Sequence, residues 1–366
     1  MDLRKLLPVG IVILLFAAYG WYIRSPAARS APDVLGDTEF PSGVALIQDS
    51  VTLFPASHLT LGSIFAADHS WVNALPPEKT VTMIATGDVI PARSVNSGMV
   101  RRNNFRWPFE KTADVLSAAD ITVINLETPL LSSCTPTIDG MVFCGDARAA
   151  EGLTYAGIDI ATLGNNHVGN YFEAGIEETK RVLTQAGILP VSGSVVYTTV
   201  KGTRFAFLSY NDIGHEEPGV PWADEVIIAR DIKEAENNAD VVIVAYHWGT
   251  EYVTQPGARQ RELAHMAVDS GADVVLGNHP HWIEPVELYK DAFIIYAHGN
   301  FVFDQEWSEE TKRGVVGKYV FYDNKLIDVQ YLPVRIVDYG QPYFLANTEA
   351  ATVLNAMEKA SAELQL

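Results

Sequence analysis

Short apolar runs alternate with amphipathic stretches along most of the chain, beginning at Thr80. Short runs bounded by turn residues are typical of buried strands, and apolar residues spaced three to four apart are typical of helices. The runs occupy residues 81–85, 121–124, 158–163, 205–208, 241–246, 274–276 and 293–296. Helical spacing covers residues 109–119, 172–186 and 259–270. This alternation predicts an α/β domain.

Most of the predicted strands end in a side chain that can bind a metal or move a proton. These side chains are Asp88, Glu127, Asn166, His167, His247, His279 and His281. Ligands of open α/β sheets bind beyond the carboxyl ends of the strands, so we expect these residues to converge on one rim. Carboxylate, amide and imidazole donors without a thiolate suit Mn, Fe, Zn or Mg, and they do not distinguish between these ions.

Each of these residues also has a structural interpretation. Asp88 follows a glycine and fits a turn or a helix N-cap, and Glu127 fits a surface turn. His167 alone fits a hydrogen-bonded polar residue. His279 and His281 would point to the same side of an extended chain, and the proline between them disfavours a helix. The joint pattern favours a metal centre, because all of these residues follow strands of one domain.

The first 24 residues follow a different pattern. Arg4 and Lys5 precede an almost unbroken apolar run from Leu6 to Ile23, which is just long enough to cross a hydrocarbon core about 30 Å thick. We predict a single N-terminal membrane anchor over residues 1–24, with a cleaved signal peptide as the alternative. Either interpretation places the bulk of the protein outside the cytoplasmic membrane.

Four segments are predicted along the chain. After the anchor, residues 25–79 form a linker and a small lead-in that packs on the main domain. The main domain spans residues 80–355 and includes strand-like runs at 318–322 and 326–332. A helical tail from Ala346 to Leu364 closes the chain, so that residues 356–366 are the end of the C-terminal helix.

Composition limits the class of protein. Of 366 residues, 48% are hydrophobic and 19% are charged, so the chain can bury a sizeable core. A formal net charge of −19 argues against a nucleic-acid partner, which would need a basic surface. Cys134 and Cys144 lie in a loop-like segment rich in Ser, Thr, Pro and Gly. We predict that they form a disulfide outside the cytoplasm, with two unpaired thiols as the alternative.

Six short strings resemble those of the bacterial capsule synthesis protein CapA family, in the same order. They are Gly87-Asp88-Val89, Asn125-Leu126-Glu127, Asn165-Asn166-His167, His247-Trp248-Gly249-Thr250-Glu251-Tyr252, His279-Pro280-His281 and Gly299-Asn300-Phe301. The resemblance covers about residues 80–355, and the shared order is more specific than any one string. It implies a role in poly-γ-glutamate capsule synthesis or export, with capsule-synthesis proteins of the membrane as partners.

That family in turn resembles the calcineurin-like metallophosphoesterases, which implies a layered α-β-β-α sandwich with one or two divalent ions. The implied metal ligands are Asp88 and His281 at a first ion, Asn166, His247 and His279 at a second, and Glu127 bridging the two. His167 would act as a general acid or stabilise charge. Arg93 could hold an anionic oxygen of the substrate. Asn125 and Asn300 are further candidates from the matching strings.

The sequence departs from the metallophosphoesterase pattern at one position. Those enzymes usually carry a histidine two residues after the first aspartate, where this chain has Ile90. The first site is therefore one ligand short unless water, Asn125 or another residue supplies it. Two functions stay open: a metal-dependent hydrolase acting on a phosphorylated substrate, and a non-catalytic subunit of an export complex that binds acidic polymer.

Overall fold

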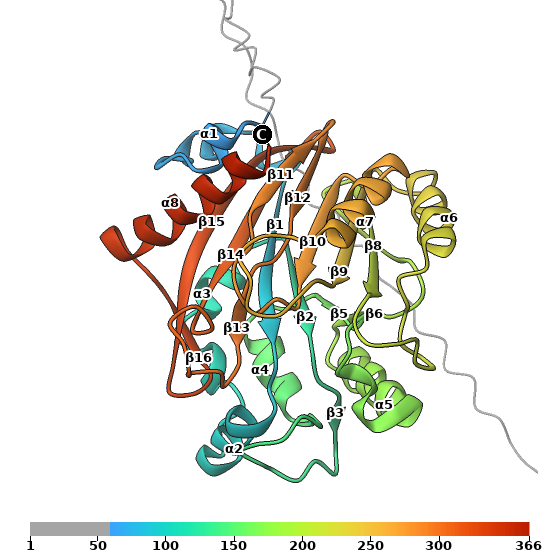
Figure 1. The fold of residues 1–366 in the computed structure, drawn as a ribbon, viewed down its shortest axis with the longest axis vertical. Coiled ribbons are helices and arrows are strands. Elements are labelled where there is room, and N and C mark those ends of the chain that lie inside the picture. Colours follow the sequence, from blue (N-terminus) through green and yellow to red (C-terminus); the bar gives the residue numbers. More distant parts are fainter. Residues whose placement is uncertain (1–58, 366) are drawn as a thin grey trace, which may run out of the picture. The chain divides into compact units, whose positions relative to one another are not determined.

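Two β-sheets form the centre of the fold in the computed structural model, which describes residues 59–365 (Figure 1). The first sheet has the order β16-β15-β14-β1-β2-β5-β6, and β13 also pairs with β1. The second has the order β11-β12-β10-β9-β8-β7, and β3 and β4 form a separate pair. The predicted anchor over residues 1–24 lies outside the described residues.

The strands of the first sheet are β1 (Thr80–Val89), β2 (Ile121–Leu126), β5 (Ile160–Thr162), β6 (Leu189–Val191), β13 (Asn300–Val302), β14 (Arg313–Tyr322), β15 (Lys325–Val337) and β16 (Gln341–Phe344). Those of the second are β7 (Val196–Val200), β8 (Thr203–Asn211), β9 (Val241–His247), β10 (Val274–Asn278), β11 (Val286–Tyr289) and β12 (Ala292–Ile295). The small pair consists of β3 (Leu130–Leu131) and β4 (Gly145–Asp146).

Alternating side chains of the strands supply two kinds of core. Met83 of β1 and Ile243 of β9 belong to one buried cluster between the sheets. Their neighbours Ile84 and Val244 point the other way and pack against helices. Successive side chains of a strand face opposite sides of its sheet, and in β9 both sides are buried, so this strand is apolar along most of its length.

Helices cover the outer face of each sheet. The first sheet packs against α2 (Arg93–Arg102), α3 (Ala113–Leu116), α4 (Ala149–Tyr155) and α5 (Phe172–Gln185). The second packs against α6 (Glu225–Glu236) and α7 (Ala258–Asp269). The predicted layered α-β-β-α sandwich is therefore confirmed.

The helix predictions were incomplete. The helix expected over 109–119 is only the four residues of α3, preceded by a 3-10 turn at Trp107–Phe109. Thr112 donates both its N–H and its hydroxyl to the carbonyl of Phe109, and such local bonds compete with a continuous helix. Helices α2, α4 and α6 were not predicted, although Asp224 caps α6 by accepting hydrogen bonds from the N–H groups of Val226 and Ile227.

The two ends of the described chain pack beside one another on the sheets. Helix α1 (Leu61–Ile64) and helix α8 (Asn347–Leu364) both contact β15, and α8 also contacts β11 of the second sheet (Figure 1). His69 follows α1, and its Nδ1 lies 2.9 Å from a carboxylate oxygen of Asp328 on β15. Among residues 59–365, no helix is both long and apolar enough to cross a membrane.

The direction of the strands brings the candidate metal-binding residues to one edge of the two sheets. In the first sheet β1, β2 and β5 run parallel, and in the second β8, β9 and β10 run parallel. Asp88 lies near the end of β1 and His247 ends β9, while Glu127 directly follows β2 and His279 directly follows β10. The carboxyl ends of strands from both sheets therefore meet where the candidate residues lie.

Candidate metal centre

Asp88 is fixed at the centre by an unusually close approach of two strands. Its N–H donates to the carbonyl of Gly299, 3.0 Å away, just before β13. A Cβ atom on the preceding residue, Gly87, would lie 2.0 Å from that same oxygen, so only glycine fits there. The Asp88 carboxylate is fully buried, accepts from Asn125 Nδ2 at 2.8 Å, and lies 3.0 Å from His281 Nδ1.

The Glu127 carboxylate is the strongest indication of a cation-binding site. Both of its carboxylate oxygens are buried, and neither has a hydrogen-bond partner among the described residues. Burial, and then the nearby charge of Asp88, raise the pKa of Glu127 well above its usual range. A buried carboxylate without partners is strongly unfavourable, and a bound cation would satisfy it.

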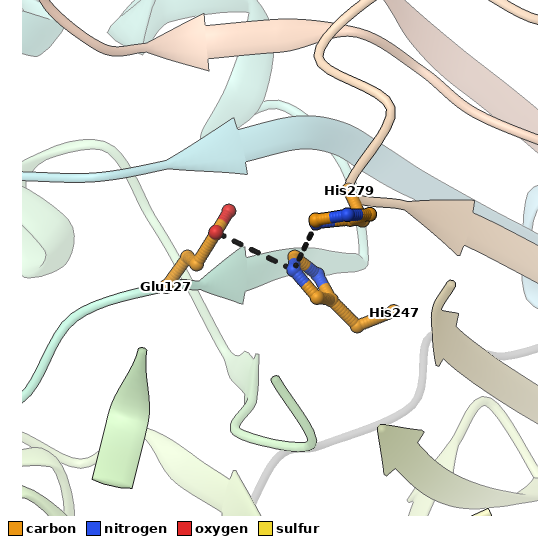
Figure 2. Close-up of side chains that lie close together, drawn as sticks. All are labelled: Glu127, His247 and His279. Carbon is orange, nitrogen blue, oxygen red and sulfur yellow. Dashed lines mark hydrogen bonds and ion pairs between the residues drawn. The ribbon is translucent and has the colours of Figure 1, made fainter. Parts of the chain in front are cut away.

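Two imidazoles face this carboxylate. His247 Nε2 lies 3.4 Å from Glu127 Oε1 and 3.1 Å from His279 Nδ1, so three potential donor atoms point toward one another (Figure 2). Burial lowers the pKa of His247 to about 3 and that of His279 well below its usual value. Both rings are therefore neutral at pH 7, which is the form that binds metals.

The backbone conformation that brings His281 to the centre differs from the predicted one. The backbone at His279 and His281 has φ angles of 97° and 57°, so the segment is a tight bend and the expected extended chain was wrong. The bend also lets the N–H of His279 donate to Asp88, 3.4 Å away. Burial alone would lower the pKa of His281, but Glu127, Asp88 and a further carboxylate raise it to about 9.

Asn165 and Asn166 are adjacent in the chain but make different contacts. The side chain of Asn165 donates to the carbonyl of Leu126 at 2.9 Å and accepts from the N–H of Val168 at 2.9 Å, so it holds the loop. The Oδ1 of Asn166 is buried without a hydrogen-bond partner within residues 59–365. Asn166 thus retains a free donor oxygen, as its predicted role requires.

His167 lies at the wall of the cavity beside the centre. Its Nδ1 lies 3.0 Å from Asn170 Oδ1, which already accepts from the N–H of Phe143, so the proton belongs on Nδ1. Burial lowers the pKa of His167 to about 4, and Nε2 is then the unprotonated atom at pH 7. In this environment His167 suits hydrogen bonding at Nε2 better than proton donation.

Arg93 is near the centre, but its charge is already paired. Its guanidinium forms an ion pair with Asp304 and lies 4.9 Å from the ring centroids of both Phe143 and Phe303. Asp304 also accepts from the N–H of Ser94, 3.0 Å away, at the start of α2. The predicted hold on an anionic substrate oxygen would therefore have to compete with Asp304.

The two further asparagine candidates differ in what they can offer. Asn125 donates from Nδ2 to Asp88, and its Oδ1 accepts from Asn165 Nδ2 at 3.2 Å, so it positions ligands. Asn300 pairs in register with Asp88, and its Nδ2 donates to the carbonyl of Thr311 at 2.9 Å. Its Oδ1 is buried without a partner in the described part of the chain.

One residue near the centre was not predicted. A carboxylate oxygen of Glu251 and ring nitrogens of His279 and His281 all lie within 4.8 Å of one another. Two further groups meet the same limit, Glu127 with His247 and His279, and Asp88 with Glu127 and His281. Glu251 lies four residues after His247 within one of the matching strings, but its spacing from the other ligands gave no signal.

The fold and these donors define a layered α/β protein with a candidate divalent-metal centre at the ends of its strands. Residues 82–305 match the family described as bacterial capsule synthesis protein PGA_cap, and the chain belongs to this family. The resemblance to the CapA proteins is thereby confirmed.

Two relatives by sequence agree with this assignment, whereas the likeness to one solved structure is too weak to bear on it. The chain is 37% identical over 268 residues to the PGA biosynthesis protein CapA of Bacillus subtilis, covering 68% of this chain and 70% of the relative. It is 30% identical over 285 residues to the capsule biosynthesis protein CapA of Bacillus anthracis, covering 72% and 69%. The crystal structure of a novel phosphatase from Mycoplasma pneumoniae aligns at 14% identity with a TM-score of 0.48, covering 70% of this chain and 94% of that chain.

Proposed function

We propose that this protein is a metal-dependent hydrolase of the phosphoesterase type that acts in the production of a poly-γ-glutamate capsule. The family and the names of its relatives support the biological role. One observation carries the chemical role: the buried Glu127 carboxylate, whose oxygens have no hydrogen-bond partner in the described chain, faces neutral imidazoles. Such a donor set is typical of a dinuclear centre with a carboxylate bridge.

The residues that would hold the ions fall into two groups around Glu127. Asp88 and His281 form one group with Glu127, and His247 and His279 form the other, to which Asn166 would add its free oxygen. Divalent cations bound there would polarise a phosphoryl oxygen and make water a better nucleophile. They would also more than neutralise Asp88 and Glu127, so an anionic substrate can approach although the whole chain is strongly acidic.

The chain's own side chains shape the space next to this centre. A cavity of about 230 Å³ is lined by His167, His281, Glu251, Arg93 and a set of aromatic side chains. The aromatic lining residues are Phe143, Tyr252, Phe303 and Trp307. These walls would exclude water from a bound phosphoester, and the unprotonated Nε2 of His167 would accept a hydrogen bond from the attacking water or a substrate hydroxyl.

The proposed location rests on the sequence. The apolar run from Leu6 to Ile23 would anchor the protein in the cytoplasmic membrane, with residues 59–365 on the outer side. In that position the hydrolase would meet nascent capsule polymer or a phosphorylated precursor, together with membrane proteins of capsule synthesis.

A second candidate function is a non-catalytic subunit that binds poly-γ-glutamate during export. Two observations favour it: Ile90 stands where metallophosphoesterases carry a ligand, and the guanidinium of Arg93 is paired with Asp304. Ion-assisted binding of the acidic polymer would then replace turnover.

Metal analysis of the purified full-length protein, combined with turnover of bis(p-nitrophenyl) phosphate, separates the two functions. The hydrolase predicts that His247→Ala loses both metal and turnover, whereas His215→Ala, which changes an exposed histidine, keeps both. Bound metal with no turnover but with retention of poly-γ-glutamate would favour the binding subunit. A wild-type protein that binds no divalent metal would refute the proposed centre.

A further inference from the structure

The first cation position lacks a donor at residue 90, directly after β1. Ile90 is fully buried in a small apolar cluster with Ala92, Phe143 and Phe303, so its side chain is committed to packing. Its N–H donates to the carbonyl of Val302 at 2.6 Å, which fixes the backbone in that position. Three protein donors then remain for the first ion: Asp88, Glu127 and His281.

The loop after β9 places a carboxylate beside this position. Glu251 is half-buried and lines the same cavity as His167 and His281. One of its carboxylate oxygens lies within 4.8 Å of ring nitrogens of both His279 and His281. His281 therefore belongs to two donor groups at once, one with Asp88 and Glu127 and the other with Glu251 and His279.

The backbone holds Glu251 in place. The N–H of Tyr252 donates to the carbonyl of Pro280 at 2.8 Å, which joins this loop to the bend that carries the two histidines. Tyr252 has a φ of 63°, a conformation that is rare for a bulky residue. Its hydroxyl also accepts from Gln305 Nε2 at 3.0 Å. Strained backbone that is held by several hydrogen bonds is typical of functional loops. Here the hydrogen bonds of Tyr252 fix the position of the neighbouring Glu251 carboxylate.

We propose that Glu251 is a metal ligand, and that it supplies the first ion with the donor that position 90 does not. This assignment rests on the metal centre of the proposed function. Asn125, the other candidate for this task, has its amide oxygen occupied by Asn165 and turns its NH2 group toward Asp88. The first ion then has the carboxylates of Asp88, Glu127 and Glu251 and a single imidazole.

This ligand set has a consequence for the choice of metal. Replacing an imidazole by a carboxylate adds a hard oxygen donor and a negative charge. Oxygen-rich sites suit Mn²⁺ and Mg²⁺, whereas nitrogen-rich and sulfur-rich sites suit Zn²⁺. We therefore expect the first position to prefer Mn²⁺ over Zn²⁺, while the second position keeps two imidazoles.

The assignment can be tested without relying on activity. Binding of Mn²⁺ to the full-length protein is measured by titration and by electron paramagnetic resonance. The wild type should bind two Mn²⁺ ions that give an exchange-coupled spectrum. Glu251→Gln should lower the affinity for one of the two ions by at least about tenfold. The remaining ion should then give the six-line spectrum of isolated Mn²⁺. Glu251→Ala should do the same, and Glu262→Gln, an exposed carboxylate on α7, should match the wild type.

The outcomes distinguish this assignment from the metal centre itself. If both Glu251 variants bind two ions with wild-type affinity and a coupled spectrum, Glu251 is not a ligand and the proposed function is unaffected. If the wild type binds no Mn²⁺ or other divalent ion, the metal centre is refuted together with this assignment. Circular dichroism of each variant checks that the fold is retained.

Discussion

The ring of Phe143 stacks on the imidazole of His167, with centroids 4.0 Å apart and planes inclined by 20°. The N–H of Phe143 donates to Asn170 Oδ1 at 2.6 Å, the same oxygen that lies 3.0 Å from His167 Nδ1. The next residue, Cys144, is bonded to Cys134 through a disulfide with a Cα–Cα distance of 5.8 Å. The disulfide loop therefore sets the orientation of a candidate catalytic imidazole.

Removing the disulfide should lower turnover and leave metal binding intact. In a Cys134→Ser, Cys144→Ser double variant, the segment that carries Phe143 loses its covalent cross-link, and we expect kcat for the phosphodiester to fall by about tenfold. The loss of loop closure should lower the free energy of unfolding by about 2–3 kcal/mol. Metal content and kcat measured on the same preparation test this, and an unchanged kcat would show that His167 is held independently of the loop.

Metal binding should release protons. Without a cation, the nearby carboxylates raise the pKa of His281 to about 9, so this imidazole retains a proton near pH 7. An incoming ion must displace that proton, and its affinity should rise as the pH increases from 6 toward 9. Calorimetric titration of Mn²⁺ at pH 7.5 in buffers with different ionisation enthalpies should reveal net proton release. Equal apparent enthalpies in all buffers would contradict this.

The pair of His69 and Asp328 should stabilise the protein mainly at low pH. The hydrogen bond to Asp328, only partly opposed by burial, raises the pKa of His69 above its ordinary value. The charged pair therefore contributes fully below about pH 6.5, the ordinary pKa of histidine, and is lost as the pH rises through the folded-state value. His69→Gln should cost about 1.5–3 kcal/mol at pH 5.5 and less at pH 8.5. Urea unfolding of both proteins at the two pH values measures this, and an equal cost at both would count against a charged pair.

The close approach of β1 and the segment before β13 predicts strong sensitivity at Gly87. A methyl group there would overlap the Gly299 carbonyl, so Gly87→Ala should displace the strand and lower the free energy of unfolding by about 3 kcal/mol or more. Because the same carbonyl holds Asp88, metal affinity should fall as well. Gly62→Ala is a suitable control, since the atom nearest to its added methyl group lies 3.9 Å away. Equal stability of the two variants would refute the steric argument.

The layered fold and most of the candidate ligands could be predicted because they depend on local patterns. Each apolar run forms a strand over at least part of its length, and residues at strand ends share a rim whatever the loops do. Asp88, Glu127 and His247 were found in this way. Asn166 was a candidate from the same strand-end pattern, and its free Oδ1 is consistent with a role as a ligand.

The remaining features depend on encounters between distant segments. Glu251 lies on a loop whose position is set by a backbone hydrogen bond from Tyr252 to Pro280. Nothing in the sequence around either residue predicts that hydrogen bond. Arg93 is neutralised by Asp304, a partner 211 positions away in the chain. The bend at His279 and His281 requires φ angles that residue type alone does not indicate. Only the packed structure establishes these three relationships.

The donors of the centre are divided between the two sheets, with Asp88 and Glu127 on the first and His247 and His279 on the second. A bound ion would therefore cross-link the two layers at this rim, in addition to the polar contacts that already join them there, such as those of His279 and His281 with Asp88. Separating the sheets would require the ion to leave, so excess metal should raise the unfolding temperature, by linkage worth about 2.7 kcal/mol at a hundred times Kd. The same cross-link would slow amide hydrogen exchange in β1 and β9 together, so the ion would have a structural role as well as a catalytic one.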